Sequence, residues 1–402
     1  MSELVRRIAF TIGALLIFRL GTQIPVVPML MQTGAPLPAG VFPRVSIFSL
    51  ALLPYFSAAV IIRLLCMVCG RLNALEQSGE AGRRAIARAT LILTLVLAAF
   101  QAYGVASGLQ AVSSLVDRSD RLFLLSATTS IVGGVFVLIW LAEQITRHGI
   151  GNGLALVWSV SILAPLPREI AVVRKVVDQG MVSGDLVLLH IVFWLIVVVL
   201  MVLAEGARRN VRVDFPGCKV GTRMLPVRSA VLPIKLNSAG VLIPIMVAPW
   251  FWSLPLALAA RNFGGHAPWL VAAHNAIAFG KPAHLIIGSI VVFVLALVYT
   301  SYVVDPERAA DSLAKRGGAI PGVEPGEPTA TYLDRVMSSI AIVGAVYLVA
   351  VSLIPEAFAG HGNLLLPYEI SGGSVLIVVC TILDIQKQVR EVSLTNLGGE
   401  HR

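Results

Sequence analysis

Ten long apolar segments constrain the fold of this chain more than any other feature. A helix that crosses a bilayer needs about 20 mostly apolar residues, and windows of this kind recur along the whole sequence. They cover residues 8–27, 46–69, 89–111, 122–145, 150–167, 185–205, 238–260, 283–304, 335–355 and 371–386. The sequence therefore predicts an all-α integral membrane protein with ten transmembrane helices.

The composition agrees with a membrane location. Apolar residues make up 57% of the 402 residues and charged residues only 13%, whereas a soluble domain carries about 25% charged residues. The net charge of +9 could indicate nucleic-acid binding, but the chain has too little polar surface for a soluble basic protein. Basic loops that face anionic lipids explain the charge better. We expect no cleavable signal sequence, because the first apolar run is long and lacks a small-residue cleavage site.

The distribution of Lys and Arg predicts the orientation in the membrane. With the N-terminus in the cytoplasm, the predicted cytoplasmic segments hold 21 of the 31 basic residues and the opposite side holds 8. Arg19 and Arg63 lie inside predicted helices and account for the rest. Because positive charge is retained on the cytoplasmic side, both termini are expected in the cytoplasm, with the chain in the cytoplasmic (inner) membrane.

The even number of helices predicts two halves, residues 1–172 and 173–402. If the two groups of five helices are related, an odd number per half requires the second half to run inverted through the membrane. Inverted repeats place a functional path at their interface. The sequence shows no convincing internal similarity, so this arrangement rests on the helix count.

Two predicted cytoplasmic segments, 206–237 and 305–335, are unusually long for connections between helices. Their length favours a docking platform for a partner, although ordinary positively charged loops would explain the charge alone. Gly and Pro residues between 317 and 328 fix turns, so the second segment is expected to be an ordered, hairpin-like loop. The basic docking candidates are Arg208, Arg209, Arg212, Lys219, Arg223, Arg228, Lys235, Arg308, Lys315 and Arg316.

Ionisable residues inside a membrane often mark function, and this chain offers few of them. Apart from Asp384, near the expected cytoplasmic end of the last helix, Asp and Glu lie only at the ends of the predicted spans. Glu143, Glu205 and Glu356 fall at predicted helix ends. A secondary transporter of small molecules, which usually needs a buried carboxylate, is therefore the disfavoured alternative.

The sequence offers no catalytic or metal-binding constellation. The seven histidines are scattered without metal-ligand spacing, and no nucleophile elbow or phosphate loop occurs. Cys66 and Cys69 form a lone CxxC inside one apolar run, where small packing residues are the better interpretation. We expect neither an enzyme nor a bound cofactor or metal.

Short motifs in a fixed order along nearly the whole chain resemble one family. They include Ser46-Ile47-Phe48, Leu53-Pro54-Tyr55, Gly79-Glu80-Ala81-Gly82-Arg83-Arg84, Pro233-Ile234-Lys235-Leu236-Asn237, Tyr332-Leu333-Asp334-Arg335-Val336 and Gly372-Gly373-Ser374. The ordered set is similar to SecY, the pore subunit of the bacterial Sec protein-conducting channel. The resemblance implies a pore between two inverted five-helix halves that passes unfolded secretory proteins across the membrane and releases hydrophobic segments laterally into lipid.

The resemblance also implies a ring of apolar side chains at the waist of the pore. Such a constriction resists wetting and blocks ions, yet yields to a passing polypeptide. The implied ring is Leu52, Phe56, Leu154, Trp158, Ile245 and Ile377. Apparent one-residue shifts against the family pattern leave Leu242, Met246 or Val378 as replacements for the last two. Phe56 and Trp158 are bulkier than the aliphatic residues usual in the family, so a tighter or asymmetric waist is expected; plain packing is the alternative.

A lateral gate is implied between the second and third helices and the seventh and eighth. Ser57, Gln101 and Asn237 match the polar positions of the family there. Uncharged polar groups across a helix seam contribute about 1 kcal/mol or less each, weak enough for a hydrophobic signal sequence to displace them. Routine bonding between helices is the alternative interpretation.

Two departures from the family indicate a divergent or accessory member. The segment between Pro28 and Ser46 is short and rich in Pro and Gly, so the plug helix that seals the closed pore is expected to be missing. Glu324 occupies a position where the family usually carries Arg, a residue tied to engagement of the SecA motor. A reversed charge at a docking site adds repulsion as well as losing attraction.

The partners implied by the resemblance are small SecE-like and SecG-like subunits and, on the cytoplasmic face, the SecA motor ATPase or a translating ribosome. The substrate would be an unfolded secretory polypeptide. A non-conducting interaction protein descended from a channel is the remaining alternative, which the short first external segment and Glu324 keep open.

Overall fold

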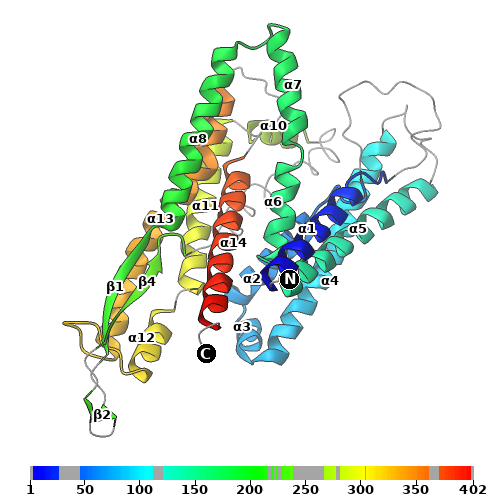
Figure 1. Ribbon diagram of the computed structural model, residues 1–402. Coiled ribbons are helices and arrows are strands. Elements are labelled where there is room, and N and C mark those ends of the chain that lie inside the picture. Colours follow the sequence, from blue (N-terminus) through cyan, green and yellow to red (C-terminus); the bar gives the residue numbers. More distant parts are fainter. Residues whose placement is uncertain are drawn as a thin grey trace. The chain divides into compact units, whose positions relative to one another are not determined.

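The structure is a computed structural model in which most of the chain is helical (Figure 1). It describes residues 3–26, 46–111, 121–215, 219–220, 223–224, 228–238, 267–277, 281–303, 305–361 and 371–399. The chain forms two compact units. Unit 1 comprises Met1–Arg168 and Cys380–Arg402, and unit 2 comprises Glu169–Val379. The predicted pair of inverted halves, 1–172 and 173–402, stays a prediction.

Unit 1 is a bundle of helices around α4 and α5. Its helices are α1 (Glu3–Gly21), α2 (Leu53–Val68), α3 (Gly70–Gln77), α4 (Glu80–Ala111), α5 (Arg121–His148), α6 (Gly153–Leu163) and the later part of α14 (Gly372–Gly399). Where α4 meets α5, Ala98 and Ala102 are fully buried against Ile131 and Val135. Small residues let helices approach closely, which is how helices associate where lipid surrounds them.

The second predicted span, 46–69, is helical only from Leu53 and ends at a sharp bend. α2 ends at Val68, α3 begins at Gly70, and the two helices are bent by 106°. The backbone of Cys69 between them is extended, with φ −94° and ψ 104°. The prediction that Cys66 and Cys69 share one apolar helix is therefore wrong. An ion pair between Arg63 on α2 and Glu76 on α3 bridges the bend.

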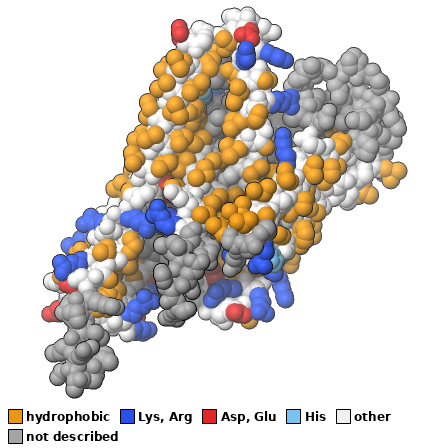
Figure 2. All heavy atoms as spheres, in the orientation of Figure 1, with side chains coloured by type: hydrophobic (Ala, Val, Ile, Leu, Met, Phe, Trp, Pro, Cys, Tyr) orange, Lys and Arg blue, Asp and Glu red, His pale blue; other side chains and the backbone are white. Residues whose placement is uncertain are grey.

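Unit 2 contains the most apolar of the described helices and a β-hairpin. Its elements are most of α7 (Leu166–Asp178), then α8 (Gly184–Gly206), β1 (Arg208–Phe215), β2 (Lys219–Val220), β3 (Arg223–Met224), β4 (Arg228–Lys235), α10 (Pro268–Ala276), α11 (Pro282–Val303), α12 (Pro306–Lys315), α13 (Glu327–His361) and the start of α14. The mean hydropathy of α8 reaches 3.2. It exposes apolar side chains from Leu186 to Leu203, which Figure 2 shows as orange spheres, and such a surface suits lipid.

Several helices are long and apolar enough to cross a membrane. Among the described residues seven helical segments meet that test, or eight if the bent α2–α3 pair counts as one span. Helices occupy nine of the ten predicted spans, whereas nearly all of the span 238–260 lies outside the described residues. The prediction of a multi-pass, helical membrane protein is confirmed, and the number ten stays a prediction.

Candidate channel residues and docking platform

Two bulky ring candidates contact each other in unit 1. Phe56 lies on α2 and Trp158 on α6, and their ring centroids are 4.7 Å apart with planes at 69°, an edge-to-face contact. Leu52, directly before α2, is fully buried, and Phe56 is 6% exposed. Edge-to-face aromatic pairs contribute about 0.5–1.5 kcal/mol beyond the area that they bury. Sequence segments far apart thus place their largest apolar side chains against each other.

The start of α6 is fixed by hydrogen bonds that sequence analysis did not foresee. The side chain of Asn152 accepts from the backbone N–H of Leu154 at 3.0 Å and of Ala155 at 3.4 Å, which caps the helix. The backbone N–H of Gly151 donates to Oε1 of Gln388 on α14 at 2.8 Å. Gly151 has φ +85°, a conformation that favours glycine.

A second bond joins the same two helices further along. Ser159 donates to the hydroxyl of Thr381 at 3.0 Å, and both side chains are buried. The helix that carries Leu154 and Trp158 is therefore anchored at two levels to the part of α14 that belongs to unit 1. This anchoring gives the aromatic pair a rigid base.

The candidate lateral-gate residues are placed in separate units. Ser57 on α2 and Gln101 on α4 are half-buried in unit 1, where these two helices pack together. Asn237 belongs to unit 2 and is 8% exposed. Its amide nitrogen donates to Glu205 at the end of α8, at 2.9 Å. Its buried Oδ1 has no hydrogen-bond partner among the described residues.

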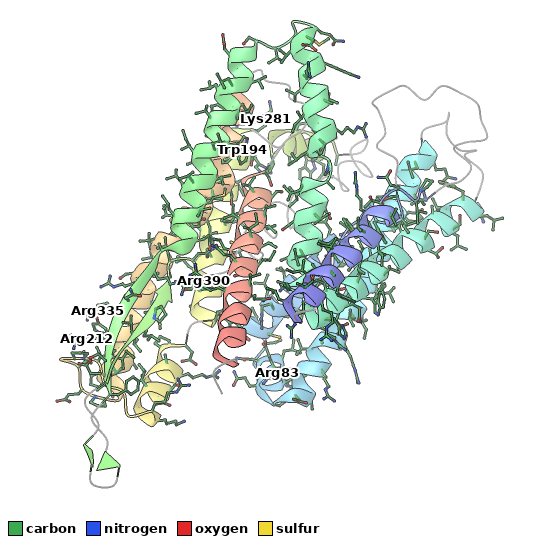
Figure 3. The ribbon with its side chains drawn as sticks, viewed as in Figure 1. Arg83, Trp194, Arg212, Lys281, Arg335 and Arg390 are labelled. Atoms are coloured by element: carbon green, nitrogen blue, oxygen red, sulfur yellow. The ribbon has the colours of Figure 1, made fainter. Side chains whose placement is uncertain are left out.

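The described parts of the two long segments, 206–237 and 305–335, form one platform with its own core. β1 and β4 pair antiparallel from Arg208 opposite Lys235 to Phe215 opposite Arg228. The backbones of Asp214 and Ala319 exchange two hydrogen bonds of 2.8 and 2.9 Å, which join the hairpin to the second segment. The buried core consists of Val211, Val213, Ile234, Ala310, Ile320, Leu333, Val336 and Ile340. We call this body the platform; Figure 3 labels Arg212 and Arg335 on it.

Most basic docking candidates lie exposed on the platform. The exposed ones are Arg208, Arg209, Arg212, Lys235, Arg308, Lys315 and Arg316. The structure describes only the backbone of the other three, Lys219, Arg223 and Arg228. A cavity of about 370 Å³ is lined by Arg308, Asp311, Ser312, Lys315 and Arg316 on or next to α12. Its three cations suit an acidic partner segment.

One ion pair orders the exposed face of the hairpin. Arg212 donates to Asp214 at 3.1 Å and to Ser229 on the opposite strand at 3.3 Å. Hydrogen bonds from Ser229 and then from Arg212 hold the pKa of the Asp214 carboxyl below its ordinary value. The carboxylate therefore stays ionised at neutral pH and keeps Arg212 along the strand.

The second segment corrects the prediction of a hairpin-like loop. Residues 306–315 form helix α12, and α13 begins at Glu327, well before the predicted span. Glu324 lies exposed in the turn between them, where Thr329 donates to its carbonyl at 2.7 Å. Gly322 and Gly326 have φ of +81° and +104°, so this ordered turn depends on glycine at both positions.

Comparisons with known proteins decide the family. The chain matches the SecY family over residues 46–386. This chain belongs to the SecY family. The protein translocase subunit SecY of Vibrio cholerae is 36% identical, over 97% of this chain and 92% of the relative.

Solved structures of this class share the fold. A structure described as that of a protein conducting channel has a TM-score of 0.68 and 18% identity, and covers 98% of this chain and 93% of that chain. Sec61 in a canine ribosome-channel complex has a TM-score of 0.63 and 17% identity, with coverage of 98% and 93%. The predicted SecY-like fold is therefore confirmed.

The other two SecY-type ring candidates lie outside unit 1 or outside the described residues. Ile377 on α14 is 2% exposed and belongs to unit 2, and its neighbour Val378 is half-buried. Ile245, with the alternatives Leu242 and Met246, lies outside the described residues. The ring as a whole, like the lateral gate, stays a prediction.

A buried titratable pair in unit 2 was missed at the sequence level. Glu356 is 7% exposed and lies inside α13, which continues past Pro355 to His361, so its placement at a helix end was wrong. It faces His284 of α11, with 3.4 Å between Oε1 and Nε2. This buried carboxylate weakens the argument that the chain is no secondary transporter because its spans hold none. Membership of the SecY family is now the evidence against a transporter.

Proposed function

We propose that this chain is the central pore subunit of a Sec translocon, through which unfolded secretory proteins cross the cytoplasmic membrane. Membership of the SecY family over residues 46–386 carries the proposal. The relative in Vibrio cholerae bears the name protein translocase subunit. The family is a family of channels, and we infer that this chain is a passive pore rather than an enzyme.

The energy for transport would come from a partner on the platform. We assign the platform to the SecA motor ATPase or a translating ribosome, because it is an ordered, basic body of two joined segments. The canine Sec61 neighbour belongs to a ribosome-channel complex. Small SecE-like and SecG-like subunits complete the assembly. With both termini in the cytoplasm, the platform faces the motor and its basic residues also face anionic lipids.

The pore would close mainly through its apolar ring. Residues 27–45, where the plug helix is expected to be missing, lie outside the described residues. At the ring positions that the resemblance implies, Phe56 and Trp158 are larger than the usual aliphatic side chains of the family, and their rings are in contact. A bulky apolar constriction excludes water and ions, and this pair supports a seal that depends less on a plug. Hydrophobic segments would leave through the gate near Ser57, Gln101 and Asn237.

A complementation experiment tests the proposal and the role of Glu324. The host's main SecY is depleted, and secretion is measured with this chain, with Glu324→Arg and with Glu327→Arg as a matched control. Glu327 is also exposed and lies in the same turn region, at the start of α13. We expect Glu324→Arg to raise secretion several-fold over the unmodified chain, because it restores attraction to the motor, whereas Glu327→Arg should not.

The outcomes separate the alternatives. Rescue by the unmodified chain would show a translocation channel that engages a partner despite Glu324. Failure of every variant, with the protein present in the membrane at normal level, would contradict the proposal and favour a specialised, non-conducting interaction protein.

A further inference from the structure

The link from α8 into the platform has little support of its own. α8 ends at Gly206, Ala207 is extended with φ −68° and ψ 131°, and β1 begins at Arg208, so that α8 runs directly into β1 (Figure 1). A Cβ added at Gly206 would meet no atom of another described element within 4 Å. Because glycine is the most permissive residue, this link would bend easily if the residues around it did not hold it.

One side-chain hydrogen bond spans the link. Nδ2 of Asn237, two residues after the end of β4, donates to Oε1 of Glu205 in the last turn of α8 at 2.9 Å. Asn237 is 8% exposed, and Glu205 is half-buried. A hydrogen bond that is shielded from water is electrostatically stronger than an exposed one, so this bond can fix the angle between the helix and the hairpin.

Two backbone contacts support the same place. The N–H of Leu236 donates to the carbonyl oxygen of Ala207 at 3.2 Å. The carbonyl oxygen of Leu236 would lie 2.5 Å from a Cβ at Gly344, so α13 lies directly against the backbone there. The end of α8, the end of the hairpin and α13 therefore meet. We call this set of contacts the brace; its residues are Glu205, Ala207, Leu236, Asn237 and Gly344.

The chemistry of Glu205 indicates a role in geometry. It is an acidic residue in the last turn of α8, where the helix carbonyls already carry a partial negative charge and disfavour another. Arg208 and Arg209 follow within four residues, yet within the described part of the chain Glu205 pairs with neither of them. Its partner is the neutral amide of Asn237. A directional bond to an amide orients two segments, whereas it does not neutralise the charge.

The brace connects α8 to a rigid body. The platform is fixed to α13 through its buried core, in which Leu333, Val336 and Ile340 come from α13. α8 buries Met201 but no other residue of Gly184–Gly206 in the described structure. Among the described contacts, the end of α8 next to the platform is therefore held by the brace.

We propose that Glu205 is a positioning residue that braces α8 against the platform, so that force on the platform moves α8 and does not bend the link at Gly206. The proposal rests on the proposed function, in which the SecA motor docks on the platform. A platform on a flexible link would absorb the movement of a bound motor, whereas a braced platform passes it to the membrane helix. Glu205 thus acts after docking.

Two substitutions of Glu205 separate the hydrogen bond from the charge. Glu205→Ala removes the acceptor and leaves the buried amide of Asn237 without it, whereas Glu205→Gln removes the charge and keeps an acceptor oxygen. Gly206→Ala, added to Glu205→Ala, restricts the backbone of the link at a position that is open in the described structure. Asp185→Ala, in the exposed first turn of the same helix, is the matched control.

The deciding experiment is SecA-driven transport of a secretory precursor into liposomes that contain the full chain with its small subunits. The rate is measured as a function of SecA concentration. In Glu205→Ala the maximal rate should fall about tenfold, with the half-maximal SecA concentration unchanged, because docking is intact and transmission is lost. Glu205→Gln and Asp185→Ala should keep the unmodified rate, and the double variant with Gly206→Ala should recover part of the loss.

The contrary results are equally specific. An unchanged maximal rate in Glu205→Ala, or an equal loss in Glu205→Gln, overturns the proposal. A higher half-maximal SecA concentration without a lower maximal rate would assign Glu205 to docking and also overturn it. No recovery in the double variant would overturn the role of the link at Gly206. If Glu205→Ala does not accumulate in the membrane, Glu205→Asp, whose shorter side chain withdraws the acceptor, takes its place.

A second measurement tests the brace without a motor. Spin labels on Leu195 of α8 and Val231 of β4, both exposed, report the distance between helix and hairpin in lipid nanodiscs after the native cysteines are replaced by Ser. The distribution of distances should be narrow in the unmodified chain and in Glu205→Gln, and broad in Glu205→Ala; equal widths overturn the brace. If the unmodified chain transports no precursor at any SecA concentration, the proposed function fails, and the label distances alone decide the brace.

Discussion

Two contacts in this protein each join a pair of helices, one through apolar side chains and the other through polar side chains. In unit 1, Phe56 and Trp158 join α2 to α6 through an edge-to-face contact of aromatic rings. In unit 2, His284 and Glu356 join α11 to α13 through a buried polar pair. The aromatic contact can part and leave no unsatisfied group, whereas separation of the polar pair exposes two groups that need partners. The first kind of contact suits a constriction that opens, and the second suits a joint that stays closed.

The largest effect is expected when one half of the polar pair is removed. Glu356→Leu should lower the free energy of unfolding by about 3–5 kcal/mol, because it removes one partner of a buried pair and takes the carboxylate away from Nε2 of His284. Chemical denaturation of the purified protein in detergent measures this loss. Replacement of both residues by Leu should recover most of it, and a single variant as stable as the unmodified chain would contradict the distinction between the two contacts.

The aromatic contact should show its role in conductance more than in stability. Phe56→Ala together with Trp158→Ala should increase ion leak through the channel in planar bilayers several-fold, since the constriction loses the rings that exclude water. The coupling energy between the two positions should be about 1 kcal/mol in a double-mutant cycle. Tyr103→Ala, which removes an exposed aromatic ring on α4, is a control of similar size. No change in leak would argue against an aromatic seal.

A smaller effect is expected at the hydroxyl bond that anchors α6. Thr381→Val removes the acceptor of Ser159 and should cost about 0.6 kcal/mol, the average for such bonds inside membranes. It should also loosen the attachment of α6, which carries Trp158, so that ion leak through the channel increases slightly. Ser161→Ala on the same helix, whose hydroxyl bonds only its own turn among the described residues, is the control and should leave leak unchanged.

The smallest effect concerns the water-exposed platform. The depressed pKa of Asp214 means that its bonds stabilise the hairpin above the ordinary value of 3.8 and are lost as pH falls through the lower, folded value. Amide exchange in Arg208–Phe215 should accelerate in that acid range beyond the intrinsic effect of pH. Asp214→Asn should remove this acid-dependent step; persistence of the step would assign it to another group.

The sequence predicted the helices wherever an apolar run alone determines the outcome. Runs such as 185–205 and 283–304 differ by only one or two residues from α8 and α11, because lipid requires a helix to satisfy the backbone internally. The break at Cys69 was missed, because apolar residues continue up to it and the bend depends on contacts of α3 with α2 and α4. α13 was ended too early at Pro355, although membrane helices tolerate proline.

The candidate sites were predictable only in part, for a related reason. The order of motifs predicted Phe56 and Trp158 as ring candidates, and their rings are in contact. No local sequence pattern indicates that His284 pairs with Glu356 or Ser159 with Thr381. Those pairs depend on how helices remote in sequence pack together. The platform was foreseen from segment length and charge. Its strands were not, because the arginines of β1 mask the alternation of Val211 and Val213.

The anchoring of α6 by the last helix has a consequence for biosynthesis. Gln388 and Thr381 belong to unit 1 together with Gly151 and Ser159. Unit 1 therefore lacks the later part of α14 until almost the whole chain has been synthesised. The half of the molecule that leaves the ribosome first is therefore the half that matures last. Until then the amide of Gly151 and the hydroxyl of Ser159 lack these hydrogen-bond partners, which come from the other end of the polypeptide. A chain that ends before Thr381 therefore cannot complete the packing of unit 1.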